Sequence, residues 1–193
     1  MTRTVFFTAT TLDGYLADEH DSLDWLFVQD IDDDSPMSIT DFMATVGCLV
    51  MGSTTYRWVL DHQARVGEPW PYEQPSFVFT HQDLPLAAAN VTLVQGEPAE
   101  HLEAIRAAAG DRDVWLVGGG DLAAQFAEAG SLDELMVSIA PVTLGGGRPL
   151  FPRRYDLRLT RVDRNGAFLC AWYDVVGPGD WPDPTAAGAD APG

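Results

Sequence analysis

An apolar strand, three glycines and a helix follow one another in VWLVGGGDLAAQF, residues 114–126. The β-branched and aromatic residues at 114–117 favour a buried strand, and residues 121–129 are helical in composition until Gly130 stops them. Consecutive glycines let the backbone approach a ligand closely, and free amide N–H groups at a helix start suit a phosphate. An ordinary tight turn is the alternative. The segment therefore predicts a strand–turn–helix unit whose turn can take a phosphate.

The same order of strand, glycine and helix recurs in LVMGSTTY, residues 49–56. The hydroxyls of Thr54 and Thr55 stand at the expected helix start, where they suit a pyrophosphate or simply cap the helix. Ligands of open α/β sheets bind at the carboxyl ends of the strands, where both turns would lie. The glycine segment also fits G-x-G-x-x-A, but it comes late in the chain and no suitable acid follows it, which argues against a Rossmann domain. One shared binding edge is the prediction.

The rest of the chain alternates strands with helices and then ends in strands. Ser35 and Pro36 are typical of a helix N-cap and first helical residue, and Asn165-Gly166 is a strong hairpin signal. Further strands are expected at 4–10, 48–51, 76–80, 91–94, 133–143, 156–163 and 167–176, further helices at 36–46, 54–60 and 98–109, and a loop over 61–75. This pattern predicts an α/β fold, with a mostly parallel central sheet and an antiparallel C-terminal edge hairpin. Residues 1–176 form the expected domain, and 177–193, rich in Pro, Gly, Ala and Asp, an expected disordered tail.

Composition argues against several classes of function. The formal net charge of −18 opposes binding to nucleic acid and to anionic membranes. Every basic residue is Arg, so chemistry that needs a lysine amine is excluded. The histidines and the two cysteines, Cys48 and Cys170, show no metal-site spacing, so no metal is expected, and both thiols are expected in the core. No apolar run reaches membrane length and no signal peptide precedes the first strand, so the expected compartment is the cytoplasm.

Four motifs together resemble the dihydrofolate reductase-like superfamily, and more closely its branch of riboflavin-biosynthesis reductase domains and related small bacterial reductases. They are TLDGYLA (11–17), VMGSTTY (50–56), GGG with Gln125-Phe126 (118–126) and LDELMVSIAPVTLGGG (132–147). The resemblance covers about residues 3–176. It implies a single-domain, three-layer fold and an NAD(P)H-dependent reductase that transfers a hydride directly to a small C=N or C=O substrate.

The resemblance also implies cofactor-binding positions. The backbone of Ala9 and Leu16 would hold the nicotinamide carboxamide, and Thr80 and His81 would lie near the adenosine ribose. The pyrophosphate would lie between two sets of residues, Gly52, Ser53, Thr54 and Thr55 on one side and Val117, Gly118, Gly119, Gly120, Asp121 and Leu122 on the other. All of these positions follow predicted strands, which agrees with the binding edge inferred from the turns.

The resemblance implies NADPH as the cofactor, with NADH as the alternative. Dihydrofolate reductases usually place an Arg after the first phosphate glycine to bind the 2′-phosphate, whereas this chain has Ser53 there. His81 and Arg57 are the remaining candidate cations.

The proton source and the substrate pocket have several candidates. Asp13, Asp24 and the acids at 32–34 could donate a proton if burial raised the pKa of the carboxyl. Trp25 could wall the substrate pocket or belong to the core, and Ser138 could bind the substrate by hydrogen bonding. Gly145–Gly147 with Arg148 are expected to be structural or part of an interface rather than phosphate-binding.

Dihydrofolate itself is not an expected substrate, because the loop at 67–75 carries no cation for a glutamate tail. The two competing interpretations are a catalytically inactive nucleotide-binding sensor and a ribosylaminopyrimidine reductase of riboflavin synthesis. A homodimer that pairs through the later strands is expected from the resemblance.

Overall fold

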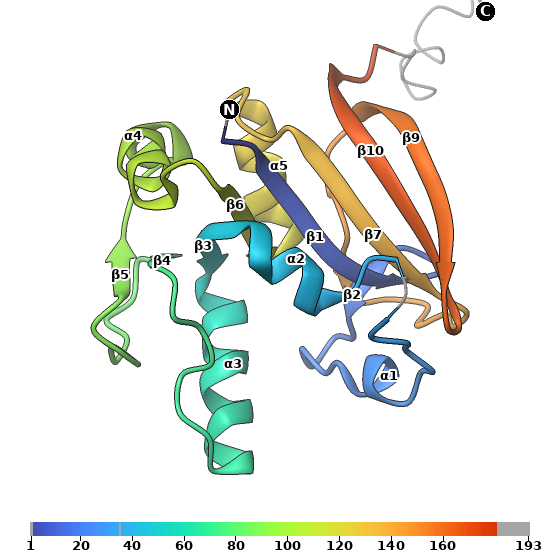
Figure 1. The fold of residues 1–193 in the computed structure, drawn as a ribbon, viewed down its shortest axis with the longest axis horizontal. Coiled ribbons are helices and arrows are strands. Elements are labelled where there is room, and N and C mark those ends of the chain that lie inside the picture. Colours follow the sequence, from blue (N-terminus) through green and yellow to red (C-terminus); the bar gives the residue numbers. More distant parts are fainter. Residues whose placement is uncertain (1, 35, 181–193) are drawn as a thin grey trace, which may run out of the picture.

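Eight strands form one sheet in the order β5-β4-β3-β6-β1-β7-β10-β9 (Figure 1). The computed structural model describes residues 2–34 and 36–180. The pairs from β5 through to β7 are parallel, whereas β10 is antiparallel to both β7 and β9. The predicted mostly parallel sheet with an antiparallel C-terminal hairpin at one edge is confirmed.

The strands are β1 (Thr4–Thr11), β2 (Tyr15–Ala17), β3 (Val46–Gly52), β4 (Ser76–Phe79), β5 (Val91–Val94), β6 (Asp113–Gly118), β7 (Glu134–Ala140), β8 (Arg148–Pro149), β9 (Tyr155–Asn165) and β10 (Phe168–Pro178). The helices are α1 (Asp24–Phe27), α2 (Ile39–Thr45), α3 (Ser53–Val66), α4 (Pro98–Ala109) and α5 (Gly120–Glu128). Strands β2 and β8 pair with each other outside the main sheet.

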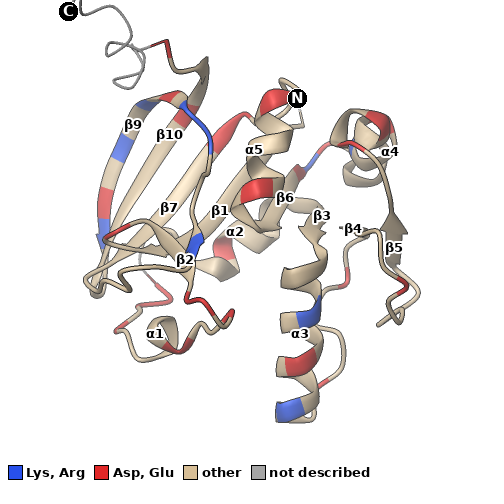
Figure 2. Cartoon of the chain, turned by 180° about the vertical axis from the view of Figure 1, so that it is seen from behind, with Lys and Arg blue, Asp and Glu red and all other residues tan. Residues whose placement is uncertain are grey.

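Helices cover both faces of the sheet, which gives three layers. In Figure 1, α2 lies in front of the sheet and α5 behind it, and Figure 2 shows the reverse face. One buried cluster joins Phe42 of α2 and Tyr56 of α3 to the strands. The cluster on the opposite face joins Ile105 of α4 and Phe126 of α5 to the strands.

Alternation along the central strands explains this double burial. On β1, Val5 belongs to the first of these clusters and its neighbour Phe6 to the second, and both are fully buried. On β3, Leu49 and Val50 divide between the two faces in the same way. Successive side chains of a strand point to opposite faces, so a strand buried on both sides is apolar throughout. Cys48 and Cys170 are buried free thiols, as predicted.

Several element boundaries differ from the sequence prediction. Helix α2 begins at Ile39, because Ser38 is its N-cap and accepts from the amide of Asp41 at 3.5 Å. The prediction that a helix starts at Pro36 was therefore wrong, and its proposed cap, Ser35, lies outside the described residues. Helix α3 continues to Val66, six residues into the expected loop, because no helix-breaking residue precedes Gly67.

The C-terminal strands also have different ends. Strand β7 stops at Ala140, three residues early, because Pro141 has no amide hydrogen with which to continue the ladder. Strand β10 continues to Pro178, two residues into the expected tail, and residues 181–193 lie outside the described residues. The short elements α1, β2 and β8 were not predicted.

Candidate functional site

A cleft runs along the carboxyl ends of the parallel strands and consists of two adjoining pockets. The first pocket has a volume of about 420 Å³ and the second about 370 Å³. Both are lined by Thr54, Thr55, Gly119 and Asp121, which make them parts of one cleft. The sequence analysis expected a binding site at this edge.

Two glycine turns place helix starts on the cleft. β3 and β6 are neighbours in the sheet, with Met51 opposite Gly118, so their carboxyl ends lie together. The N-caps of α3 and α5 are Gly52 and Gly119, and neither helix has a side-chain cap. The alternative that a threonine caps the first of these helices is therefore not what the structure shows. The uncapped amides at both helix starts remain free for an anion.

Close packing explains why the second turn needs glycine. A Cβ atom at Gly118, where φ is +159°, would lie 2.9 Å from the Thr55 hydroxyl oxygen. A Cβ atom at Gly120 would collide with the backbone carbonyl oxygens of Pro149 and Leu150. The turn is therefore pressed against α3 on one side and against β8 and the residue after it on the other.

All of the residues predicted to bind the cofactor line this cleft. Those on the first pocket are Ala9, Leu16, Thr54, Thr55, Val117, Gly118, Gly119, Gly120 and Asp121. Those on the second pocket are Gly52, Ser53, Thr54, Thr55, Thr80, His81, Gly119, Asp121 and Leu122. The structure thus brings all fourteen positions together, while their roles toward a cofactor stay predictions.

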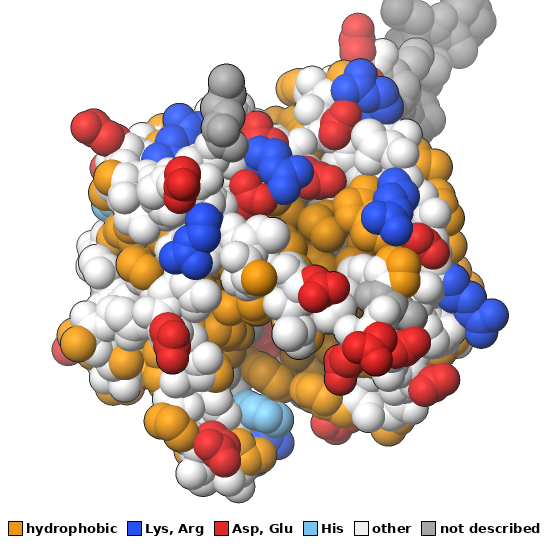
Figure 3. All heavy atoms as spheres, viewed as in Figure 1, with side chains coloured by type: hydrophobic (Ala, Val, Ile, Leu, Met, Phe, Trp, Pro, Cys, Tyr) orange, Lys and Arg blue, Asp and Glu red, His pale blue; other side chains and the backbone are white. Residues whose placement is uncertain are grey.

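The first pocket has mostly apolar walls. Trp25, predicted to wall a substrate pocket, lines it, together with residues that the sequence analysis missed: Leu23, Leu26, Trp58, Pro149 and Pro152. Phe27 of α1 stacks on Trp58 and His62 of α3, with ring centroids 6.0 and 5.9 Å apart, so the two helices meet beside the pocket. Figure 3 shows this hollow, with hydrophobic side chains inside and a histidine at its rim.

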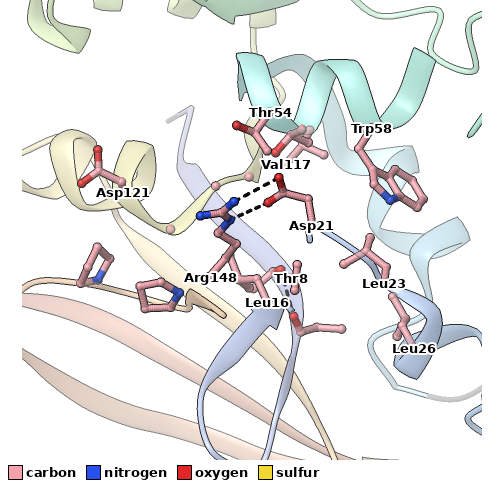
Figure 4. Close-up of a pocket in the computed structure, with 18 of the residues that line it drawn as sticks. Thr8, Leu16, Asp21, Leu23, Leu26, Thr54, Trp58, Val117, Asp121 and Arg148 are labelled. Atoms are coloured by element: carbon pink, nitrogen blue, oxygen red, sulfur yellow. Dashed lines mark hydrogen bonds and ion pairs between the residues drawn. The ribbon is translucent and has the colours of Figure 1, made fainter. Parts of the chain in front are cut away.

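An ion pair crosses the first pocket. Arg148 of β8 donates to both carboxylate oxygens of Asp21, at 2.5 and 3.2 Å (Figure 4). Strand β8 reaches this place because it pairs with β2, and because the amide of Leu150 donates to the carbonyl oxygen of Gly14 at 2.8 Å. Arg148, expected to be structural or part of an interface, therefore lines the cleft.

The second pocket has a largely neutral polar wall. Gln82, Gln95 and Gln125 line it beside the predicted threonine and serine positions. Asp121 contributes a carboxylate, which accepts from Gln125 at 2.7 Å and pairs with Arg153 at 3.1 Å. Among the described residues that line this pocket, His81 is the one that can carry a positive charge. Arg57, the other candidate for a 2′-phosphate, lines neither pocket.

Asp13 and Asp24, the proposed proton donors, do not line either pocket. The Asp13 carboxylate accepts from the hydroxyl of Thr11 at 2.5 Å and from the amides of Leu144 and Gly145 at 3.0 and 2.7 Å. These hydrogen bonds, that from Thr11 first, lower the pKa of Asp13 below its ordinary value. A general acid needs a raised pKa and a place at the substrate, so the position of Asp13 fits an anchor for the loop that leads to β8.

The other two predicted residues are placed as follows. Asp24 is exposed in the first turn of α1. The Ser138 hydroxyl of β7 donates to the sulfur of Met37 at 3.1 Å and lies 3.9 Å from the sulfur of Cys170. Ser138 lines neither pocket, and its role toward a substrate stays a prediction.

The Asp13 anchor should make stability depend on pH. Since the folded pKa is lowered, the carboxylate stabilises the fold above its unfolded pKa, near 3.8, and that contribution is lost as pH falls through the folded pKa. We expect Asp13→Asn to lower Tm at pH 6 and the gap to wild type to close below about pH 4. Thermal unfolding from pH 3 to 7 measures this, with the exposed Asp24→Asn as control. A gap that stayed constant across the range would contradict the assignment.

The fold and the cleft together define a protein of the dihydrofolate reductase-like class, in which a mostly parallel sheet carries two glycine turns at its carboxyl edge. The chain belongs to the RibD C-terminal domain family, whose model matches residues 3–167. Of the described residues, none lies in a helix long and apolar enough to cross a membrane.

Individual relatives agree with this membership. The chain is 29% identical over 150 residues to the Bacillus subtilis (strain 168) protein YwjB, described as uncharacterized, over 77% of this chain and 82% of that protein. A putative riboflavin biosynthesis protein from Shewanella sp. PV-4 has a similar crystal structure, with a TM-score of 0.73 and 27% identity over 90% of this chain and 99% of that one. Dihydrofolate reductase from Enterococcus faecalis, complexed with NADP(H), shares the fold, with a TM-score of 0.54 and 17% identity over 90% and 96% of the two chains.

Proposed function

We propose that this protein is a reductase that uses a reduced nicotinamide dinucleotide to transfer a hydride to a small C=N or C=O substrate. The observation that carries the proposal is the pair of uncapped helix starts, at Gly52 and Gly119, on one continuous cleft. Free amides of this kind suit a pyrophosphate, and the pocket on either side leaves room for one half of a dinucleotide. The complex of the Enterococcus faecalis enzyme with NADP(H) supports this choice of cofactor.

The residues of this chain would bind the dinucleotide and orient it. Thr54 and Thr55 would hold the pyrophosphate with the turn at 118–120, and the backbone of Ala9 and Leu16 would hold the carboxamide at the floor of the first pocket. When bound, the dinucleotide supplies the hydride itself. The protein therefore needs no lysine and no activated nucleophile.

The apolar first pocket would take the substrate. Its walls exclude water from the transferring groups, which favours hydride transfer over side reactions. Trp25 lines this pocket, and its indole Nε1 is buried with no hydrogen-bond partner among the described residues. Since this nitrogen is shielded by the protein itself, we propose Trp25 as an apolar wall of the substrate site rather than as a hydrogen-bond donor.

The proposed cofactor is NADPH, with His81 as the cation at its 2′-phosphate. We expect NADPH to bind more tightly than NADH, and His81→Ala to weaken NADPH binding about fivefold while leaving NADH unchanged. Titrations followed by tryptophan quenching measure all four dissociation constants. Tighter binding of NADH by the wild type would overturn the choice of NADPH, and binding of neither dinucleotide up to millimolar would overturn the reductase proposal.

A nucleotide-binding sensor without turnover is the second candidate. The observation in its favour is that neither Asp13 nor Asp24, the two predicted proton donors, lines the cleft. A panel of carbonyl and imine acceptors distinguishes the reductase from the sensor. Loss of reduced-nicotinamide absorbance with any acceptor would show a reductase, and no loss with all of them would favour the sensor. Dihydrofolate is included in that panel as a substrate that we expect not to be turned over.

The proposal also includes the cytoplasm as compartment, where reduced dinucleotides are made, and a homodimer as the working form. A ribosylaminopyrimidine substrate would bring a phosphate into the first pocket. The single arginine that lines this pocket, Arg148, is paired with Asp21 and lies beside the turns that we assign to the cofactor's own phosphates. Among the described residues, the pocket therefore offers no second arginine for a substrate phosphate, and we consider this substrate less favoured than an uncharged carbonyl or imine.

A further inference from the structure

Arg148 is the arginine of this cleft that can bind an anion. The chain has no lysine, and all eleven of its basic residues are arginines within the described ranges. Of these eleven, only Arg148 lines either pocket. A dinucleotide brings a diphosphate into a molecule with a net charge of −18, so one guanidinium at the cleft matters for its binding.

Arg148 is held close to the start of α5. The carbonyl oxygens of Pro149 and Leu150, the next two residues, abut Gly120 so closely that a Cβ atom there would collide with them. Figure 4 shows the Arg148 and Asp21 side chains reaching toward each other in the first pocket, with Thr54 and Val117 beside them. The guanidinium thus neighbours the same turns that the proposed function assigns to the pyrophosphate.

The Asp21 carboxylate offers Arg148 two negatively charged oxygen acceptors, as a phosphate group would. Its two carboxylate oxygens accept from Nε and from the terminal nitrogen of the guanidinium, the paired geometry that Arg also forms with phosphate oxygens. Both side chains are partly exposed, at 55% for Arg148 and 36% for Asp21. Exposed ion pairs contribute little net stability, so the partner of such an arginine can be exchanged at small cost.

We propose that Asp21 occupies Arg148 in place of the cofactor's diphosphate, and that cofactor binding exchanges one partner for the other. The inference rests on the proposed function, because it takes the diphosphate of a dinucleotide as the competing anion. Arg148 is then a cofactor-binding residue, and Asp21 is its competitor, which lowers cofactor affinity in the wild type.

The exchange predicts opposite effects from the two halves of the pair. Asp21→Asn removes the competing charge and should tighten NADPH or NADH binding about fivefold, whereas Arg148→Gln should weaken it about tenfold. In the double variant, the loss of Asp21 should bring no gain. A pair that serves only to hold β8 in place predicts that both single variants weaken binding alike, because both break the same contact.

The variants suit the local backbone. Asp21 has φ of +62°, a left-handed conformation that Asn tolerates as well as Asp does. Gln keeps much of the length of the Arg148 side chain. The matched control is the pair Arg158 and Asp174, joined at 2.6 Å at the opposite end of the sheet. Asp174→Asn and Arg158→Gln should leave cofactor affinity at the wild-type value.

Calorimetric titration with NADPH, NADH and ADP provides the test, together with Tm for each variant. ADP carries the diphosphate without nicotinamide, so it tests the exchange of partners at Arg148 separately from the reductase proposal. Tighter ADP binding by Asp21→Asn with no dinucleotide binding by wild type would support the exchange and overturn the reductase proposal. Dinucleotide binding by wild type that Asp21→Asn weakens, or that Arg148→Gln leaves unchanged, would overturn the exchange alone. No binding of any of the three ligands by any variant would overturn both.

Discussion

Gly120→Ala is expected to lower the free energy of unfolding by about 3 kcal/mol and to weaken cofactor binding about tenfold. Gly120 is the first residue of α5 and is buried. Its backbone is helical there, so alanine would suit the local conformation. The cost comes entirely from packing, because the new methyl group would meet two backbone carbonyl oxygens, those of Pro149 and Leu150. Backbone atoms cannot relieve such a contact by rotating about a side-chain bond, as a flexible side chain can.

Gly120→Ala should also lower cofactor affinity, because β8 carries Arg148. Relief of the collision requires that residues 149–150 move away from α5, and the guanidinium moves with them. Chemical denaturation measures the stability and tryptophan quenching the cofactor affinity. Gly52→Ala is the matched control, since a Cβ atom there meets nothing within 4 Å. It should cost about 1 kcal/mol or less, the ordinary N-cap preference for Gly over Ala. Equal destabilisation by the two variants would contradict the packing argument.

Local sequence signals were enough to predict the turns of the site. Gly118–Gly120 follow an apolar strand and precede a helix, and the same holds for Gly52, so each turn could be placed without knowledge of the fold. The parallel sheet then puts both at one edge, since β3 and β6 are neighbours. This is why the predicted cofactor positions meet on one cleft although they come from separate stretches of chain.

Contacts distant in sequence account for what was missed. Arg148 enters the cleft only because β8 pairs with β2, two strands of three residues or fewer with no periodicity to detect. Asp21 lies in an acidic stretch that looks like ordinary surface until its partner is known. The position of Trp58 could have been predicted, since it follows Thr54 by one helical turn and so lies on the same face of α3. The hydrogen bonds of Asp13 could not be predicted because its backbone partners, at 144 and 145, lie far along the chain, and its role as a proton donor stays a prediction.

Leu159→Asp is expected to convert a homodimer of this protein into a monomer. Leu157, Leu159, Val162 and Leu169 are 37%, 52%, 53% and 48% exposed. Their ladder partners, Val175, Tyr173, Ala171 and Ile139, place them on one face of β9 and β10, the face that α5 covers farther along the sheet. Figure 2 shows no described helix over these two strands. Four adjacent aliphatic side chains left in water favour burial against a second copy.

A carboxylate at position 159 would have to be buried without a partner in that interface. The cost should raise the dimer dissociation constant roughly a hundredfold, about 3 kcal/mol. Light scattering coupled to size exclusion measures the mass, and Leu86→Asp, at a site 63% exposed in the loop after β4, is the control that should remain dimeric. Because the cleft lies at the carboxyl edge and the patch on the hairpin face, the monomer should still bind cofactor. A wild-type protein that is already monomeric would show that this apolar face is tolerated in water and that the dimer expectation is wrong.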